Sequence, residues 1–100
     1  MRAKDADAPA EGPYARRMRE KLTEAFDPIE MEIVDDSESH RGHGGYREGG
    51  ETHFKVHLRS KAFDGKSRVQ RHRAVMSLLK PELEERVHAL NLSLLAEGEG

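Results

Sequence analysis

Histidine is the residue type with the most chemical potential in this chain, which has six histidines and no cysteine. Imidazole is the commonest side-chain metal ligand and suits iron, copper and zinc. His40 and His43 lie in a glycine-rich segment, residues 36–50, and His88 stands where we expect a strand to begin. The spacing of His40 and His43 also fits a polar loop without a metal. These three histidines are the candidate metal ligands.

The other histidines fit structural positions better. His72 falls within an apolar stripe of an expected helix, which favours a buried, hydrogen-bonded core histidine. His53 and His57 share one face of an expected strand, at a separation of roughly 13 Å at the usual strand rise. One ion cannot bridge that distance unless a third element folds over it. We therefore expect His53 and His57 to be surface residues.

A short basic run is the second candidate site. Lys66, Arg68, Arg71 and Arg73 follow one another without an intervening acid. They could contact the phosphates of a nucleic acid, although short basic runs more often form a solvated helix start. Arg71 and Arg73 could also make structural salt bridges. The formal net charge of -2 is less basic than a dedicated nucleic-acid domain usually shows.

Enzymatic motifs are missing from the sequence. It has no cysteine nucleophile and no G-x-S-x-G elbow. Gly65-Lys66-Ser67 lacks the earlier glycine of a phosphate-binding loop, because Ser60 stands in its place. Asp35 and Glu38 near His40 favour a solvated acidic loop over an acid–base pair. We expect a protein that is not an enzyme.

The elements that position these residues are built around residues 52–59. In this segment Thr52, Phe54, Val56 and Leu58 alternate with polar residues, which indicates a strand with one buried face. A turn at residues 62–65 follows, and Ser67 then suits the N-cap of a helix. The inner stripe of that helix is predicted to contain Val69, His72, Val75, Met76 and Leu79.

The remaining segments complete a two-layer α+β domain. Apolar spacing predicts a first helix from residue 13 to 26, with Tyr14, Met18, Leu22, Ala25 and Phe26 inside. Residues 29–35 form the first strand, residues 81–86 a short helical turn, and residues 88–94 the third strand. The order is therefore α–β–β–α–(short α)–β, with three strands and the helices on one face. We expect a domain over residues 13–94, with flexible tails at residues 1–12 and 95–100.

Five short motifs follow one another along the chain: Asp36-Ser37-x-x-His40, Glu51-Thr-His-Phe-Lys-Val56, Phe63-Asp-Gly-Lys-Ser67, Arg71-His-Arg73 and Val87-His-Ala-Leu90. In order, and over roughly residues 14–94, they resemble the motifs of the BolA-like family. This resemblance implies the same element order, in a fold similar to a class II KH domain. The segment that turns into the basic helix is not the Gly-x-x-Gly clamp of a true KH domain, which weakens an RNA-binding interpretation.

The resemblance also implies a function. In BolA-like proteins the histidine that matches His88 is a ligand of a [2Fe–2S] cluster, which is shared with a monothiol glutaredoxin and its bound glutathione. A second ligand comes from the loop after the first strand, where His40 matches best and His43 is the reserve. A chain without cysteine resembles the histidine subgroup and bacterial members. The implied role is iron–sulfur trafficking or iron homeostasis, and the isolated chain should bind no cofactor.

Two other interpretations remain open. BolA-like proteins include transcriptional regulators, so DNA binding through Lys66, Arg68, Arg71 and Arg73 is the alternative function. A protein-interaction module would bind a glutaredoxin equally well without iron. Composition predicts a cytoplasmic protein, since it shows no disulfide framework and no apolar run of about 20 residues. Without a partner we expect a monomer or a weak homodimer.

Overall fold

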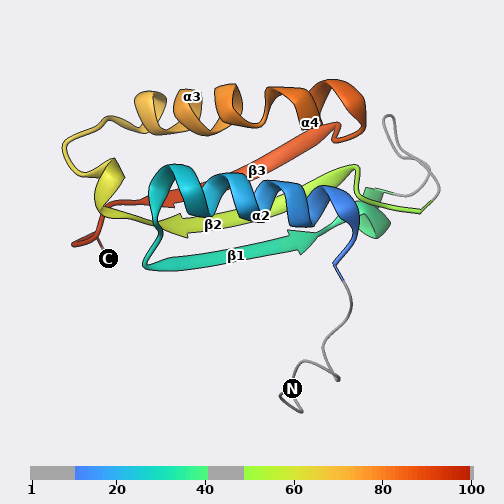
Figure 1. Cartoon of the computed structure of the whole chain (residues 1–100), viewed down its shortest axis with the longest axis horizontal. Helices are drawn as coiled ribbons and strands as arrows, with labels where there is room; N and C mark the ends of the chain where they lie inside the picture. Colours follow the sequence, from blue (N-terminus) through green and yellow to red (C-terminus); the bar gives the residue numbers. More distant parts are fainter. Residues whose placement is uncertain (1–10, 41–48, 100) are drawn as a thin grey trace, which may run out of the picture.

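The computed structural model describes residues 11–40 and 49–99, and its element order confirms the predicted α+β arrangement. The elements are α2 (Pro13–Phe26), β1 (Glu30–Asp35), η1 (Ser37–His40), β2 (His53–Arg59), η2 (Lys61–Phe63), α3 (Arg68–Leu78), α4 (Lys80–Glu85) and β3 (Ala89–Leu95) (Figure 1). The two η segments are short 3₁₀ turns that precede and follow β2.

The three strands form one mixed sheet in the order β1-β2-β3. β1 and β2 are antiparallel, with Glu30 opposite Arg59. β2 and β3 are parallel, with His53 opposite Ala89, and α3 and α4 form the crossover between them. The helices gather on one side of the sheet, which leaves the other face open (Figure 1). Because β2 and β3 are parallel neighbours, their first residues meet at the same end of the sheet.

The core lies between the sheet and the helices. Phe54, Val56 and Leu58 are at most 2% exposed, whereas Lys55 is exposed, so the predicted alternation of β2 is confirmed. From α2, the fully buried side chains are Met18 and Leu22, joined by Ala15. Ala25 is exposed, contrary to the prediction, because it lies at the border of the stripe that these residues form. The other core members are Phe63, Val75, Leu79, Val87 and Ala96.

The inner face of α3 differs from the prediction. Arg71 and Val75 are buried, and Leu79 continues the same row after the helix ends. Val69 is instead 58% exposed and His72 is exposed, so the prediction of His72 as a core histidine is wrong. An arginine can occupy the inner face here because its guanidinium finds oxygen acceptors on other elements, as described below.

The turn into α3 follows the predicted local chemistry. The Ser67 hydroxyl accepts the backbone N–H of Gln70 at 3.2 Å, and the Gln70 side chain accepts the backbone N–H of Ser67 at 2.8 Å. This reciprocal capping box satisfies two helix-end donors at once. Gly65 has a φ of +74°, a conformation that favours glycine. The chain can therefore reverse and start the helix within three residues.

A buried carboxylate joins α4 to α2. The side chain of Glu82 is fully buried, and it accepts the Arg17 Nε at 3.0 Å and the Lys21 Nζ at 2.9 Å. Glu85, one turn later, also pairs with Arg17, at 2.8 Å. This network fixes α4 and, with it, the turn that leads into β3.

β3 ends at Leu95, and the residues after it contact the rest of the domain. Ala96 is 8% exposed, and its carbonyl accepts the Arg59 guanidinium at 3.2 Å. The backbone N–H of Glu97 donates to Asp64 at 3.1 Å. The predicted domain limits of residues 13–94 stay a prediction. Over residues 11–40 and 49–99, none of the helices is both long and apolar enough to cross a membrane.

Candidate functional site

His88 lies directly before β3 with its side chain exposed. Its backbone N–H donates to the carbonyl of Thr52 at 2.7 Å. The preceding residue, Val87, is 1% exposed and donates its own N–H to the carbonyl of Glu82 at 2.9 Å. The buried Val87 therefore fixes the backbone, while the His88 imidazole faces outward at the end of the sheet.

His53 is the residue that the sequence interpretation missed. It was expected on the surface, but it is 6% exposed, and its ring centroid lies 5.3 Å from that of His88 at an interplanar angle of 52°. Its Nδ1 forms a hydrogen bond of 2.9 Å with the hydroxyl of Thr52. The alternation of β2 correctly predicted that the His53 side chain points away from the core. Its burial comes from His88, which lies next to it at the start of β3. The signal in the sequence was a histidine at the start of each of two expected strands, and the structure shows that these strands are parallel neighbours.

His57 lies on the open face of the sheet, as expected. Its ring contacts Ser93 at 3.1 Å on one side and Glu30 at 3.0 Å on the other, so it bridges all three strands. The hydrogen bonds from His57 and Arg59 lower the pKa of the Glu30 carboxyl. His57 has its own neighbours and stands apart from the pair formed by His53 and His88.

The segment after β1 is anchored next to this pair of histidines. The Asp35 carboxylate accepts the backbone N–H and the hydroxyl of Ser37, at 3.0 and 2.5 Å. The Ser37 hydroxyl oxygen in turn accepts the backbone N–H groups of Thr52 and His53, at 2.9 and 3.2 Å. Ser37 starts η1, which ends at His40. The backbone of His40 therefore belongs to an element attached at the start of β2.

The other end of the segment is held by Gly50 and Glu51. The backbone N–H of Glu51 donates to the other Asp35 carboxylate oxygen at 3.0 Å. Gly50 has a φ of +74°, and a Cβ there would lie 3.1 Å from the same oxygen. The guanidinium of Arg86 donates to the Gly50 carbonyl at 2.9 Å. Both ends of the loop are therefore fixed at the sheet end where His88 lies. His43 falls outside the described residues.

The structure divides the predicted basic run. Lys66, Arg68 and Arg73 are exposed, whereas Arg71 is 7% exposed. The Arg71 guanidinium donates to the carbonyls of Lys66 and Leu94 at 3.0 and 3.1 Å and pairs with the Glu99 carboxylate at 2.5 Å. This hydrogen bond lowers the pKa of Glu99. Arg71 thus makes the structural contacts that the sequence left open.

The described residues alone do not form a complete metal site. Across residues 11–40 and 49–99, no group of three or more His, Asp or Glu side chains lies together in a way that could hold an ion. His88 with its neighbour His53 is the imidazole pair that the structure brings together. Any site that includes His88 needs ligands from the loop, from a partner, or from both.

A family model described as BolA-like protein matches residues 22–99. The chain belongs to the BolA-like family. It is 45% identical over 76 residues to the Escherichia coli DNA-binding transcriptional regulator BolA. That match covers 76% of this chain and 69% of the Escherichia coli protein. It is also 48% identical over 80 residues to chloroplastic BOLA1 of Arabidopsis thaliana. That match covers 78% of this chain and 50% of the plant protein, so the chain spans half of that relative's length.

Solved structures of BolA-like proteins have the same fold. The BolA domain of SufE1 from Arabidopsis thaliana superposes with a TM-score of 0.80 and 41% sequence identity. The superposition covers 91% of this chain and 100% of that domain. The family and the fold that the sequence motifs predicted are therefore confirmed.

Proposed function

We propose that this BolA-like chain is a partner of a monothiol glutaredoxin and shares a [2Fe–2S] cluster with it. Its role would be non-catalytic and cytoplasmic, in iron–sulfur trafficking or iron homeostasis. His88 is the first ligand, and His40 is the second, with His43 as the reserve. The observation that carries this proposal is the exposed His88 imidazole, which lies at the sheet end where η1, and with it the backbone of His40, is anchored.

The donor set fits half of such a cluster. Iron–sulfur clusters are usually held by thiolates, and this chain has no cysteine. Two imidazoles can hold one iron, as the histidine pair of a Rieske centre does. The other iron then needs sulfur ligands, which a glutaredoxin cysteine and a glutathione thiol would supply. The chain's own residues would bring two neutral imidazoles to the interface, and the cluster would supply the iron and sulfide.

The residues around His88 would position its ring. The backbone bond to Thr52 and the buried Val87 fix the strand start, and the His53 ring packs beside the imidazole. Because His53 bonds the Thr52 hydroxyl through Nδ1, its ring orientation is fixed as well. Neighbouring groups that fix ligand orientation commonly change metal affinity by about 10- to 100-fold. We therefore regard His53 as a positioning residue.

Visible circular dichroism tests the proposal. A monothiol glutaredoxin loaded with [2Fe–2S] and glutathione is titrated with this chain, with His88→Ala and with the matched control His57→Ala. We expect a new spectrum at equimolar ratio with the wild type and with His57→Ala, and none with His88→Ala. Parallel titrations with His40→Ala and His43→Ala identify the loop ligand. An unchanged spectrum with the wild type would refute cluster sharing.

Calorimetric titrations of the same proteins distinguish cluster sharing from association of the two proteins without a cluster. If the apo-glutaredoxin binds as tightly as the loaded form, and His88→Ala binds both equally, the chain is an interaction module. Cluster sharing predicts that the wild type binds the cluster-loaded glutaredoxin more tightly than the apo form. It predicts that His88→Ala binds both forms with the same affinity. Affinities measured by calorimetry without and with the cluster give this comparison directly.

DNA binding is the second candidate function. The Escherichia coli relative is named as a DNA-binding transcriptional regulator, and Lys66, Arg68 and Arg73 are exposed at the start of α3. Cationic side chains that contact phosphates give an affinity that falls as salt concentration rises. Arg71 is buried in structural contacts and would contribute little to such a surface. Charge-reversal of Arg68 and Arg73 should abolish salt-dependent binding to duplex DNA, and binding that persists would exclude this surface.

A further inference from the structure

One edge of the sheet is open along β3. The backbone N–H of Ala89 donates to Thr52 at 3.1 Å, and the N–H of Ser60 donates to the carbonyl of Leu95 at 2.9 Å, which fixes the ladder between β2 and β3. In a parallel pair, alternate residues bond the same neighbour. Residues 89, 91, 93 and 95 therefore face β2, while residues 90, 92 and 94 direct their N–H and C=O groups to the open side. The Arg71 guanidinium that reaches the Leu94 carbonyl confirms this direction.

The sequence of β3 does not protect this edge. Edge strands of native proteins usually carry charges, proline or bulges that prevent pairing with another chain. β3 reads Ala-Leu-Asn-Leu-Ser-Leu-Leu and has none of these residues. The opposite edge strand, β1, contains three acids, Glu30, Glu32 and Asp35. The two edges differ, and only β3 has the sequence of a strand that can accept a partner.

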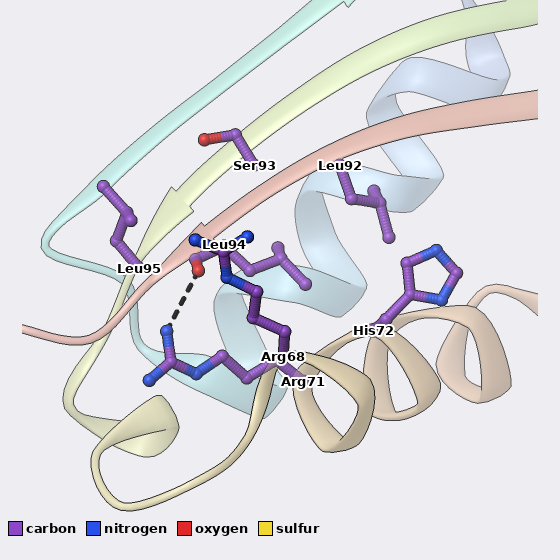
Figure 2. A pocket seen from close by; sticks show the side chains of 7 residues that line it. All are labelled: Arg68, Arg71, His72, Leu92, Ser93, Leu94 and Leu95. Carbon is purple, nitrogen blue, oxygen red and sulfur yellow. Dashed lines mark hydrogen bonds between the residues drawn. The ribbon is translucent and has the colours of Figure 1, made fainter.

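A groove with an arginine in its wall runs beside this edge. A cavity of about 410 Å³ lies between the first turns of α3 and the second half of β3. Figure 2 shows the Arg68 side chain extending from α3 toward Leu94 and the His72 ring on the side of Leu92. Leu92 and Leu94 are half-buried and form an apolar floor, whereas Arg68 and His72 are exposed. No carboxylate is among the residues that line this cavity.

Arg68 and His72 also line the outer surface of α3. A shallower hollow of about 390 Å³ is lined by Arg68, Val69, His72 and Arg73. Val69 is the apolar side chain of this hollow and is 58% exposed. Glu99, an acid close to the groove, is already paired with Arg71 and accepts the N–H of Ala96 at 2.6 Å. The groove therefore combines an open strand edge, apolar side chains and cationic charge.

We propose that β3 binds an extended acidic peptide of a partner protein as an additional strand. Strand addition supplies main-chain hydrogen bonds, here to Leu90, Leu92 and the N–H of Leu94, whose carbonyl already accepts Arg71, and alternate side chains of the peptide supply specificity. Carboxylates on the side of the peptide that faces α3 would pair with Arg68, and the alternate apolar side chains would point to the other face. A second β3 strand has no acidic side chain to meet Arg68, and DNA has no backbone amides to extend the ladder.

This site is separate from the proposed ligand site. His88 precedes β3, and Leu92 and Leu94 lie roughly 13–20 Å further along the strand at the usual rise. A partner could occupy the groove whether or not His88 binds a cluster. The inference thus goes beyond the proposed function, and either can fail alone.

A designed probe tests strand addition. The full chain is titrated with a fluorescein-labelled peptide of alternating glutamate and valine, about eight residues long to match a typical strand. Two control peptides have the same length: alternating lysine and valine, and the glutamate–valine peptide with N-methylated amides on the edge that would pair. The protein variants are Arg68→Glu, Leu92→Pro and the matched control Arg16→Glu on α2. The Leu92 N–H faces outward, so proline there removes an edge donor and spares the ladder to β2.

Strand addition predicts binding of the glutamate–valine peptide to the wild type and to Arg16→Glu. It predicts at least about tenfold weaker binding after Arg68→Glu, after Leu92→Pro and for the N-methylated peptide, because each removes charge pairing or ladder bonds. No binding to the wild type overturns the proposal. Equal binding of the N-methylated peptide overturns it too, since simple charge attraction then suffices.

Two further outcomes assign the edge to another occupant. A wild-type dimer in sedimentation that Leu92→Pro makes monomeric shows that a second copy occupies β3, which contradicts the peptide proposal. If duplex DNA binds the wild type but not Arg68→Glu, and the peptide does not bind, the groove belongs to nucleic acid instead. Because the N-methylated probe leaves the protein unchanged, the test holds even if Leu92→Pro does not fold.

Discussion

Arg71 should be a stability residue, and Arg73 on the same helix should not. Replacing Arg71 with alanine removes hydrogen bonds to the carbonyls of Lys66 and Leu94 and the ion pair with Glu99. Hydrogen bonds that involve a charged group contribute about 1.5–3 kcal/mol each. We discount the ion pair strongly, because the Glu99 side chain is 47% exposed and regains water. The expected loss is about 2–4 kcal/mol of the free energy of unfolding.

Urea denaturation followed by far-ultraviolet circular dichroism measures this loss. For a domain of this size a loss of about 1 kcal/mol lowers Tm by roughly 4–8 °C, so Arg71→Ala should melt at least about 8 °C below the wild type. Arg73→Ala should stay within about 0.5 kcal/mol of the wild type, because its side chain is exposed. Arg71→Lys keeps the charge but not the planar fork, and should recover only part of the loss. Equal stability of Arg71→Ala and Arg73→Ala would refute this assignment.

Three further predictions concern the supporting networks. Glu82→Ala should cost about 2 kcal/mol or more in urea denaturation, because it removes a buried acceptor of two cations, whereas Glu84→Ala, whose side chain is 67% exposed, should cost less than about 0.5 kcal/mol. The hydrogen bond from Arg17 lowers the pKa of Glu85 to about 2, below its ordinary 4.5. This contribution is present above about pH 4.5 and is lost as pH falls toward 2, so the stability gap between wild type and Glu85→Gln should shrink from about pH 6 to about pH 3. Ser37→Ala should cost about 1–3 kcal/mol, because two backbone N–H groups lose their acceptor, and hydrogen exchange of those two amides should accelerate.

Local sequence rules predicted the elements of this fold well. The strict alternation of β2 correctly separated Phe54, Val56 and Leu58 from Lys55, because a strand with one buried face leaves no ambiguity of period. The serine cap before α3 was equally local, since the capping box needs only residues three apart. The motifs then supplied the family and its element order, which the family match, the structure and its superposition on a relative confirm.

The errors arose where side chains depend on distant elements. Apolar spacing placed His72 inside α3, but the inner position belongs to Arg71, whose acceptors lie on β3 and after it. A hydropathy pattern cannot anticipate acceptors that are 23 and 28 residues away in the sequence. His53 was misplaced for a similar reason. Its burial beside His88 follows from the parallel pairing of β2 and β3, which the alternation within one strand does not contain.

The central claim is that His88 and a loop histidine are ligands of a shared cluster. Pulsed electron paramagnetic resonance tests it most directly, on a reduced complex of this chain, labelled with nitrogen-15 histidine, and an unlabelled [2Fe–2S] glutaredoxin with glutathione. The proposal predicts strong hyperfine coupling to two labelled nitrogens, of which His88→Ala removes one or abolishes cluster sharing altogether. A cluster spectrum without coupling to the labelled histidines, or one that His88→Ala leaves unchanged, would contradict it.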